Sequence, residues 1–307
     1  IILKSAGNEL ANQLWNYASI YSYALERNYK VKNPAFFEYG MYFNISASNM
    51  FFKFFFFLPF LNYNGRKIAF RRKVWRKFYK WYTKIIVIFV NKKLFSYDDE
   101  NYTPYYLPPT KELFGKLKEL ELNKKNIYLD GWLFRNPVGL EKYHKEIKEY
   151  FQPKESIISL IDLNIKNLRN QYQNIVGVHI RQGDYKVWRD GVYYIEQKRV
   201  REILDEYLRE TNIDKTKTCF AITSDGQIDT SLFEGLNIFL SKENMVHDLF
   251  FLSKTDIILG SNSTFNAFAA YYGNIPHIVF QKEAMDWGYY KDKKTYFQNK
   301  YSTLVHY

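Results

Sequence analysis

Short apolar runs alternate with longer amphipathic segments through the second half of the chain. The spacing of apolar positions predicts helices over residues 153–172, 194–210, 245–254 and 264–272, and strands over residues 175–180, 218–223, 237–240, 256–259 and 275–281. Gly273 is expected to end the last of these helices. Helices of this length between short β-branched runs indicate an α/β fold with a doubly wound parallel sheet. Such sheets bind their ligands at the carboxyl ends of the strands.

The first residues of the chain predict a strand, a polar turn and a helix. The strand covers residues 1–3, the turn residues 4–9 and the helix residues 10–27, with Leu14 and Ala18 on its apolar face. This order places Asn8, Asn12 and Gln13 at the amino-terminal end of the helix. Backbone N–H groups point outward there and favour an oxygen-rich ligand.

Residues 73–89 show a different pattern, that of a basic amphipathic helix. At about 100° per residue, the cations fall within one arc of about 100°. These cations are Lys73, Arg76, Lys77, Lys80 and Lys84, and the opposite side carries Val74, Trp75, Phe78, Tyr82, Ile85, Ile86 and Phe89. This composition is typical of a helix that lies in a membrane interface. We therefore expect Arg76, Lys77, Lys80 and Lys84 to contact an anionic membrane.

The net charge is concentrated in the same part of the chain. The 307 residues include 44 Lys and Arg against 32 Asp and Glu, a formal charge of +12. Residues 39–97 contain twelve basic and no acidic residues, so they account for all of that excess. A nucleic-acid-binding protein is one alternative, because cations interleaved with aromatic residues can contact phosphates and stack on bases. Another is a helix that packs on the core and exposes a solvated basic face. The confinement of the charge to one arc favours a flat anionic surface over nucleic acid.

Length and composition limit the organisation of the protein. About two domains are expected, one over residues 1–152 with a basic insert at about residues 66–93, and one over residues 153–307. Cys219 is the single cysteine, which points to a reducing, cytoplasmic compartment. The longest apolar runs, residues 54–61 and 85–90, are far below the roughly 20 residues of a spanning helix. We therefore expect a soluble protein or one that is peripheral on the inner face of the plasma membrane.

Polar residues follow three of the predicted strands. His179, Arg181 and Asp184 lie at or beyond the end of the first, Asp225 follows the second, and residues 260–264 (GSNST) open a helix after the fourth. Together they offer a guanidinium, a carboxylate and a hydroxyl-rich helix start, which suit a phosphorylated ligand that also carries a base or sugar. Each of these features also has a simpler interpretation when it is taken singly. His179 can be a packed structural histidine, and Arg181 with Asp184 can be a surface ion pair. The GSNST segment can be an ordinary helix cap.

In combination these segments resemble a known family, the α-1,2-fucosyltransferases of glycosyltransferase family 11. Residues 178–185 (VHIRQGDY) resemble its H-x-R-x-G-D-Y motif, and residues 10–18 (LANQLWNYA) resemble its L-G-N-Q-[ML]-F-Q-Y-A motif. Residues 220–225 (FAITSD), and 247–249 (HDL) with 262–265 (NSTF), resemble its two later motifs in the same order. The resemblance implies a GT-B architecture, with two Rossmann-like domains that face a cleft.

The same resemblance implies inverting transfer of L-fucose from GDP-β-L-fucose to a sugar hydroxyl. An α-1,2 linkage to galactose or a related residue of a bacterial surface glycan is implied, and a lipid-linked oligosaccharide is the expected acceptor. Arg181 would hold the diphosphate, with Asn262, Ser263 and Thr264 at the phosphates, while His179 and Asp225 contact guanine or its ribose. Asn12 would approach the reacting sugar, with Asn8 and Gln13 on the acceptor side.

Elementary chemistry agrees with these roles. The bidentate fork of an arginine suits a diphosphate, and it stabilises the charge that develops on the departing GDP. A carboxylate such as Asp225 accepts hydrogen bonds from the ring N–H and exocyclic amine of guanine. Asp184 is the first candidate for the general base, and the alternative is that it orients Arg181 or caps the following loop.

Two further features bear on the reaction. The sequence has no Asp-x-Asp triplet and no His-x-His or cysteine cluster, so we expect a metal-independent enzyme with no cofactor beyond its GDP-sugar donor. The family pattern is also not complete. Gln182 stands where a second arginine is frequent, Ala11 replaces a glycine, and Gly226 stands where a second aspartate is common. Another GDP-sugar, or another linkage, remains an alternative.

Overall fold

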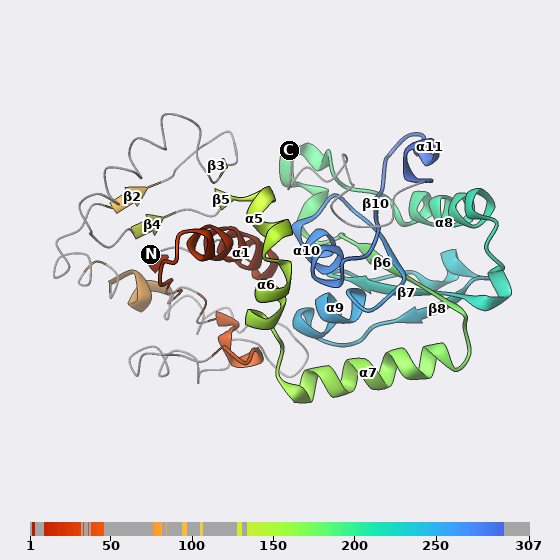
Figure 1. The fold of residues 1–307 in the computed structure, drawn as a ribbon. Helices are drawn as coiled ribbons and strands as arrows, with labels where there is room; N and C mark the ends of the chain where they lie inside the picture. The colour runs from red at the N-terminus through yellow and green to blue at the C-terminus, as the bar shows by residue number, and fades with distance from the viewer. Residues whose placement is uncertain are drawn as a thin grey trace. The chain divides into compact units, whose positions relative to one another are not determined.

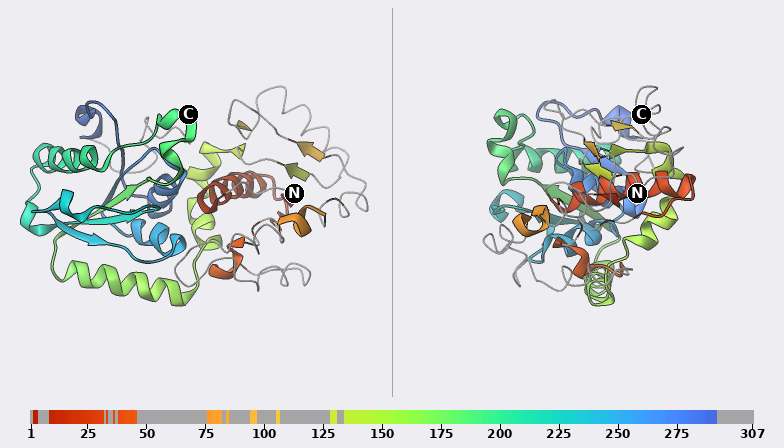
Figure 2. Two further views of the ribbon diagram at one scale, coloured as in Figure 1. Left: turned by 180° about the vertical axis from the view of Figure 1, so that it is seen from behind. Right: turned by 90° about the vertical axis from the view of Figure 1, so that its left-hand side faces the viewer.

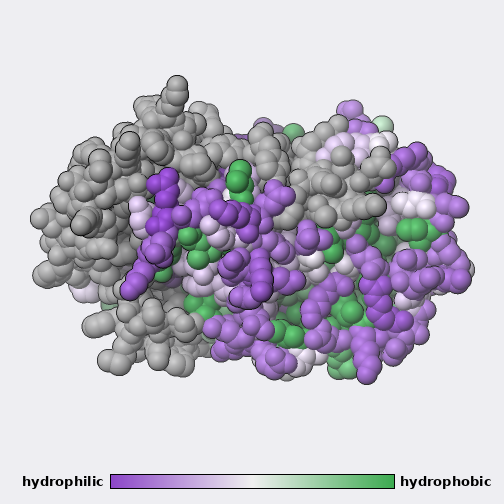
Figure 3. All heavy atoms as spheres, in the orientation of Figure 1, coloured by the Kyte–Doolittle hydropathy of each residue, from purple (hydrophilic) through white to green (hydrophobic). Residues whose placement is uncertain are grey.

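A computed structural model describes two compact parts of the protein. The described residues are 2–3, 9–31, 33, 36, 38–45, 76–81, 84, 94–96, 105–106, 128–130 and 134–291. They divide between Lys154 and Glu155 into an N-terminal unit and a C-terminal unit. Residues 4–8 of the predicted turn, Asn8 among them, and most of the basic insert lie outside the described residues. In the view of Figure 3, hydrophobic side chains appear on the described surface only as small patches among hydrophilic ones.

The C-terminal unit is built on a five-stranded parallel sheet. Its strands are β6 (Asn174–Ile180), β7 (Thr218–Ser224), β8 (Asn237–Leu240), β9 (Ile257–Gly260) and β10 (His277–Val279). They lie in the order β10-β9-β6-β7-β8, and every neighbouring pair is parallel. The chain therefore winds outward from β6 in one direction and then from β9 in the other. The predicted doubly wound parallel sheet is confirmed, and its order reverses between β6 and β9.

Helices cover both faces of this sheet. α8 (Gln197–Thr211) and α11 (Trp287–Tyr290) pack with the apolar side chains of one face, and α7 (Glu155–Arg169), α9 (Met245–Leu252) and α10 (Thr264–Gly273) lie on the other. Figures 1 and 2 show α7 and α8 on opposite sides of the sheet. The core on the α8 side contains Val176, Val178 and Ile180 of β6, which alternate with residues of the other face as period-two strands require.

The predicted end of α10 is wrong by one residue. Gly273 is the last helical residue, and Asn274 ends the helix with a left-handed φ of 50°. The glycine serves close packing instead, because a Cβ there would lie 2.3 Å from the carbonyl oxygen of Ser253. β10 is also shorter than predicted, and it ends at Val279.

The N-terminal unit contains two small parallel sheets and the predicted first helix. β1 (Ile2–Leu3), β4 (Tyr128–Asp130) and β2 (Leu94–Ser96) form one sheet, and β3 (Tyr105–Tyr106) pairs with β5 (Phe134–Arg135). α1 (Leu10–Glu26) begins where the sequence predicts. The short helices α5 (Pro137–Lys142) and α6 (His144–Tyr150) follow β5 and were not predicted.

Buried polar side chains join α1 to β5 and α5. Asn16 accepts a hydrogen bond from the Phe134 N–H at 3.1 Å. Asn136, the N-cap of α5, donates to the hydroxyl of Ser22 at 3.0 Å. All four residues are buried. Because a buried polar group that loses its partner costs about 1–3 kcal/mol, these bonds fix the position of α1 in its unit.

The basic segment is described over residues 76–81 and at residue 84, all of them helical. Tyr79 is buried, and the Arg76 guanidinium forms an ion pair with the buried carboxylate of Glu38. Phe78, which the helical pattern predicted for the apolar side, is exposed. Among the described residues, no helix combines the length and the hydropathy needed to cross a bilayer.

Candidate active site

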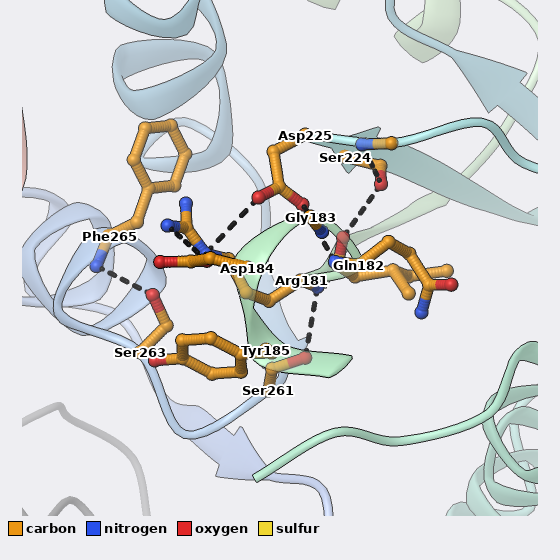
Figure 4. Close-up of polar contacts among 12 residues, drawn as sticks. Arg181, Gln182, Gly183, Asp184, Tyr185, Ser224, Asp225, Ser261, Ser263 and Phe265 are labelled. Atoms are coloured by element: carbon orange, nitrogen blue, oxygen red, sulfur yellow. Dashed lines mark hydrogen bonds and ion pairs between the residues drawn. The ribbon is translucent and has the colours of Figure 1, made fainter. Parts of the chain in front are cut away.

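Arg181 lies at the point where the strand order reverses. It follows β6 directly, and its backbone N–H donates to the hydroxyl of Ser261 at 3.1 Å. Ser261 in turn follows β9, so this bond joins the two loops that flank the reversal (Figure 4). A crevice at such a switch point is where doubly wound sheets bind their ligands. This bond thus joins the first and the third of the predicted loops.

Two carboxylates hold the Arg181 guanidinium. Nε and Nη2 donate to Oδ1 of Asp184 at 3.2 and 2.9 Å, and Nε lies 3.2 Å from Oδ2 of Asp225. The Asp184 side chain is 59% exposed, whereas those of Asp225 and Arg181 are 28% and 23% exposed. Figure 4 shows both acids pointing toward the guanidinium. The cation is therefore held in place by an exposed partner and a half-buried one.

Asp225 also orders the loop that carries Arg181. Its Oδ1 accepts hydrogen bonds from the backbone N–H groups of Gln182 and Gly183 at 2.7 and 3.1 Å (Figure 4). A Cβ at Gly183 would lie 2.7 Å from Oδ2 of Asp225, so a larger residue there would displace this carboxylate. Both oxygens of Asp225 thus have partners within the protein, and its contact with guanine stays a prediction.

Gln182 occupies the position at which the motif that residues 178–185 resemble frequently has a second arginine. Its side chain is buried and donates to the carbonyl of Ile195 at 3.1 Å. Its Oε1 accepts from the hydroxyl of Tyr194 at 3.1 Å and from the amide of Gln197 at 3.3 Å. A neutral amide satisfies all of these partners without placing a second charge in the interior. Sequence reasoning missed Tyr194 and Gln197, since nothing in the local pattern separates them from other polar residues near a helix start.

The third predicted loop forms the start of α10. Ser263 is the N-cap and accepts from the Phe265 N–H at 3.2 Å. The Tyr185 hydroxyl donates to the carbonyl of Asn262 at 3.0 Å, and the Arg181 guanidinium lies 5.3 Å from the centre of the Tyr185 ring. Burial raises the pKa of Tyr185, so its phenol stays protonated and able to donate near neutral pH. Tyr185 therefore ties the arginine to the helix start, where Thr264 is partly exposed.

His179 lies inside the protein. Nδ1 is 3.1 Å from the hydroxyl of Thr223, and the ring stacks on Phe265 at 4.6 Å between centres. Burial, reinforced by the nearby Arg181 charge, lowers the pKa of His179 to about 3, so the ring is neutral near pH 7. Nε2 is enclosed and has no hydrogen-bond partner among the described residues. This environment favours the packed structural histidine over a direct contact with guanine or ribose.

An open cavity of about 840 Å³ adjoins the Arg181 loop. It extends along the carboxyl ends of β6, β7 and β8, and its lining is Gln182, Gly183, Lys186, Gln197, Ser224, Gly226, Gln227, Ile228, Asp229, Leu240 and Ser241. The Ser241 hydroxyl donates to the buried carboxylate of Asp248 on α9, and burial raises the pKa of that carboxyl group. Asp248 lies within one of the motifs noted in the sequence, and the structure shows that it positions a hydroxyl of the cavity wall.

Two of the predicted acceptor-side residues, Asn12 and Gln13, are described and lie in the N-terminal unit. Asn12 is partly exposed in the first turn of α1, whereas Gln13 is only 2% exposed. Within the described residues, no group of three His, Cys, Asp or Glu side chains is placed to hold a metal ion.

Several solved structures are similar to this chain over most of its length. The α-1,6-fucosyltransferase NodZ crystallised with GDP matches with a TM-score of 0.50 and 14% identity, over 91% of this chain and 94% of that one. Selenomethionyl NodZ from Bradyrhizobium matches with a TM-score of 0.52 and 14% identity, over 93% and 96%. A mutant of FUT1 from Arabidopsis thaliana in complex with GDP matches with a TM-score of 0.51 and 12% identity, over 92% and 71%.

Comparison of the sequence alone gives no match, either to a protein-family model or to a curated protein. The structural similarities, at 12–14% identity, establish the fold. The chain has the α/β fold of these fucosyltransferases, and the predicted GT-B fold class is confirmed.

Proposed function

We propose that this protein transfers L-fucose from GDP-β-L-fucose to a sugar hydroxyl. The observation that carries the proposal is the joining of Arg181 to the start of α10 across the reversal between β6 and β9. A guanidinium and a helix amino-terminus at one site favour a diphosphate. Structural neighbours that were crystallised with GDP, or soaked with GDP-fucose, support the choice of nucleotide.

The charges at the site require a rearrangement when the donor binds. Arg181 with Asp184 and Asp225 carries a net negative charge, which repels a diphosphate. Asp225 is fixed by two backbone N–H groups, whereas Asp184 is mostly exposed. In our proposal the diphosphate displaces Asp184 from the guanidinium and leaves Asp225 in place. Asp184 then has both of the roles considered for it: it orients Arg181 before the donor binds, and it acts as the general base after the diphosphate has displaced it.

The nucleoside takes the cavity beside this loop. The cavity adjoins Arg181 through Gln182 and Gly183, so a diphosphate on Arg181 leads directly into it. Its walls offer amides, hydroxyls and a carboxylate from Gln197, Ser241 and Asp229. Such groups hydrogen-bond the edge of a purine and the hydroxyls of a ribose.

The chemical step is a single displacement at the anomeric carbon of fucose. The acceptor oxygen forms the new bond as the bond to the phosphate oxygen of GDP breaks, with inversion, and the carboxylate of Asp184 receives the proton of the acceptor hydroxyl. Arg181 and the N–H groups of α10 stabilise the charge on GDP, so this scheme draws its positive charge from the protein alone. We assign Asn12 to the acceptor sugar. We further propose an α-1,2 linkage, to galactose in a lipid-linked bacterial surface glycan made in the cytoplasm.

Nucleotide binding tests the donor assignment. GDP is expected to raise the melting temperature, UDP and dTDP are not, and EDTA is expected to leave the GDP effect unchanged. Arg181→Ala should remove the effect of GDP, whereas Arg201→Ala should retain it, since Arg201 lies on α8 and pairs with Asp205. Equal stabilisation by the three nucleotides would exclude the GDP assignment.

Transfer from a panel of GDP-sugars to galactose-terminated acceptors tests the reaction. Mass spectrometry should detect addition of one deoxyhexose from GDP-fucose, and linkage analysis of the product identifies the hydroxyl. Transfer from a different GDP-sugar alone would establish the alternative donor, with the nucleotide site unchanged. Arg181→Ala again serves as the inactive control.

A further inference from the structure

The helix at residues 76–81 has one side fixed to the N-terminal unit. Tyr79 is 7% exposed, and Arg76 pairs through Nε and Nη2 with the carboxylate of Glu38, itself 4% exposed. An aromatic ring and a bidentate ion pair with a buried acid hold this short segment in a defined orientation. The opposite side of the helix therefore faces away from the unit that it packs on.

That opposite side presents two aromatic rings. Phe78 is 43% and Trp81 is 58% exposed, and their ring centres lie 5.7 Å apart. They are the only aromatic residues among the exposed large hydrophobic side chains in the described part of the chain. Side chains three residues apart on a helix are neighbours, so the two rings form one apolar patch.

Three lysines share the exposed side with these rings. Lys77, Lys80 and Lys84 are all exposed. At about 100° per residue, Lys80, Lys84, Lys77, Trp81 and Phe78 follow one another around an arc of about 160°, while Tyr79 and Arg76 fall outside it. The segment at residues 39–97 contains no acidic residue. Cations thus lie along one edge of the exposed arc and aromatic rings along the other.

We propose that this surface, made of Lys77, Phe78, Lys80, Trp81 and Lys84, docks on an anionic membrane. Trp is favoured at the level of the lipid headgroups, while Lys residues are attracted to anionic headgroups by about 1 kcal/mol each. The side-by-side arrangement of rings and cations matches the apolar and charged layers that a bilayer presents together. The contact set differs from that predicted by the sequence, because Arg76 is used within the protein and Trp81 and Phe78 take part. Since it involves none of the donor-site residues, this proposal stands or falls independently of the proposed reaction.

Co-sedimentation with vesicles tests the surface. The protein is expected to bind phosphatidylcholine vesicles that contain phosphatidylglycerol at low salt, and to bind pure phosphatidylcholine vesicles far more weakly. Replacing Lys77, Lys80 and Lys84 with Gln should weaken binding about a hundredfold at low salt. Replacing Lys145, Lys198 and Lys242, which are also exposed, should change it little.

The aromatic patch has its own matched pair of variants. Phe78→Ser with Trp81→Ser should reduce vesicle binding, whereas Leu160→Ser with Leu163→Ser, an exposed pair at the same spacing on α7, should not. Brominated lipid should quench Trp fluorescence less in Trp81→Phe than in the unmodified protein. The melting temperature and the circular dichroism spectrum show whether each variant is folded. Unchanged vesicle binding in the folded lysine variant would overturn the proposal, as would binding to nucleic acid but not to vesicles.

Discussion

Two carboxylates contact Arg181, and replacing each with an amide should change the affinity for GDP in opposite directions. Asp184 is mostly exposed, and its Oδ1 accepts from both Nε and Nη2. Asp225 is half-buried and shares its oxygens between Arg181 and the backbone N–H groups of the loop. Asp184→Asn and Asp225→Asn each remove one negative charge and keep the shape of the side chain. Both should be compared with Asp190→Asn, which changes the charge in an exposed part of the same loop.

The expected magnitudes follow from exposure. An exposed ion pair contributes about 0–1 kcal/mol, so Asp184→Asn should reduce the stability of the protein only slightly. The same substitution removes a carboxylate that competes with the diphosphate for the Arg181 guanidinium. GDP should then bind about two- to fivefold more tightly. Asp225→Asn weakens a charge-assisted hydrogen bond and turns an amide N–H toward Arg181 or the loop. At about 1.5–3 kcal/mol for such a bond, GDP should bind roughly ten- to a hundredfold more weakly.

Calorimetric titration with GDP at two salt concentrations measures both effects. Asp190→Asn should give the small gain expected of a distant charge, and that gain should shrink as salt rises. Fucose transfer by Asp184→Asn should fall even though GDP binds more tightly, since the variant lacks the proposed base. Weaker GDP binding by Asp184→Asn, comparable to that of Asp225→Asn, would refute displacement of Asp184. Its role would then be only to orient the arginine.

Two other predictions concern the loop and the buried histidines. Gly183→Ala should weaken GDP binding about as much as Asp225→Asn, because its Cβ would lie 2.7 Å from Asp225 Oδ2. Gly288→Ala should leave GDP binding unchanged, because the nearest atom to its Cβ is 3.8 Å away. Equal GDP affinities of the two glycine variants would contradict this. His179 and His277 have pKa values lowered by burial from 6.5 to about 3, so stability should be lost as the pH falls from 6.5 toward 3. At pH 5 the loss is about 2 kcal/mol per histidine. His277→Gln should reduce the change in the free energy of unfolding between pH 7 and pH 5. If that free energy depends on pH as steeply as in the unmodified protein, the lowered pKa of His277 is contradicted.

The secondary structure of the second half of the chain was predictable because its apolar residues recur with clear helix and strand periods. The alternation of β-branched runs and amphipathic segments located all five strands of the C-terminal sheet, with small errors at their ends. The loop from Asp184 to Gly191 was not predicted in detail. It contains two 3₁₀ turns, and Arg189 and Asp190 adopt positive φ values of 49° and 56°. Such conformations depend on tertiary contacts, among them the bond from Lys282 Nζ to the Gly191 carbonyl at 2.7 Å.

The candidate site was predictable as a set of loops but not as a set of bonds. The sequence indicated that Arg181 and residues 260–264 lie at the same edge of a sheet. It could not show that Ser261 accepts from the Arg181 backbone, since that contact depends on β9 lying directly beside β6. Nor could it show that both oxygens of Asp225 are engaged.

The basic helix shows a further limit of periodicity. The helical pattern at residues 73–89 predicted which residues share a side of the helix, but it did not say which of them faces the protein. Tyr79 does so, and Phe78 does not, because the segment docks through Tyr79 and the Arg76–Glu38 pair.

The reversal of strand order also bears on how the protein folds. The bond between Arg181 and Ser261 spans 80 residues of sequence, and β7 and β8 are formed by the chain between them. Contacts of such long sequence separation close slowly, so the candidate site is complete only after β9 has paired with β6. A ligand that requires both loops stabilises only molecules in which this pairing has formed. Binding of the nucleotide would thus show that β9 has paired with β6, the strand pairing of longest sequence separation in this sheet. Nascent chains that end before β9 would lack the site.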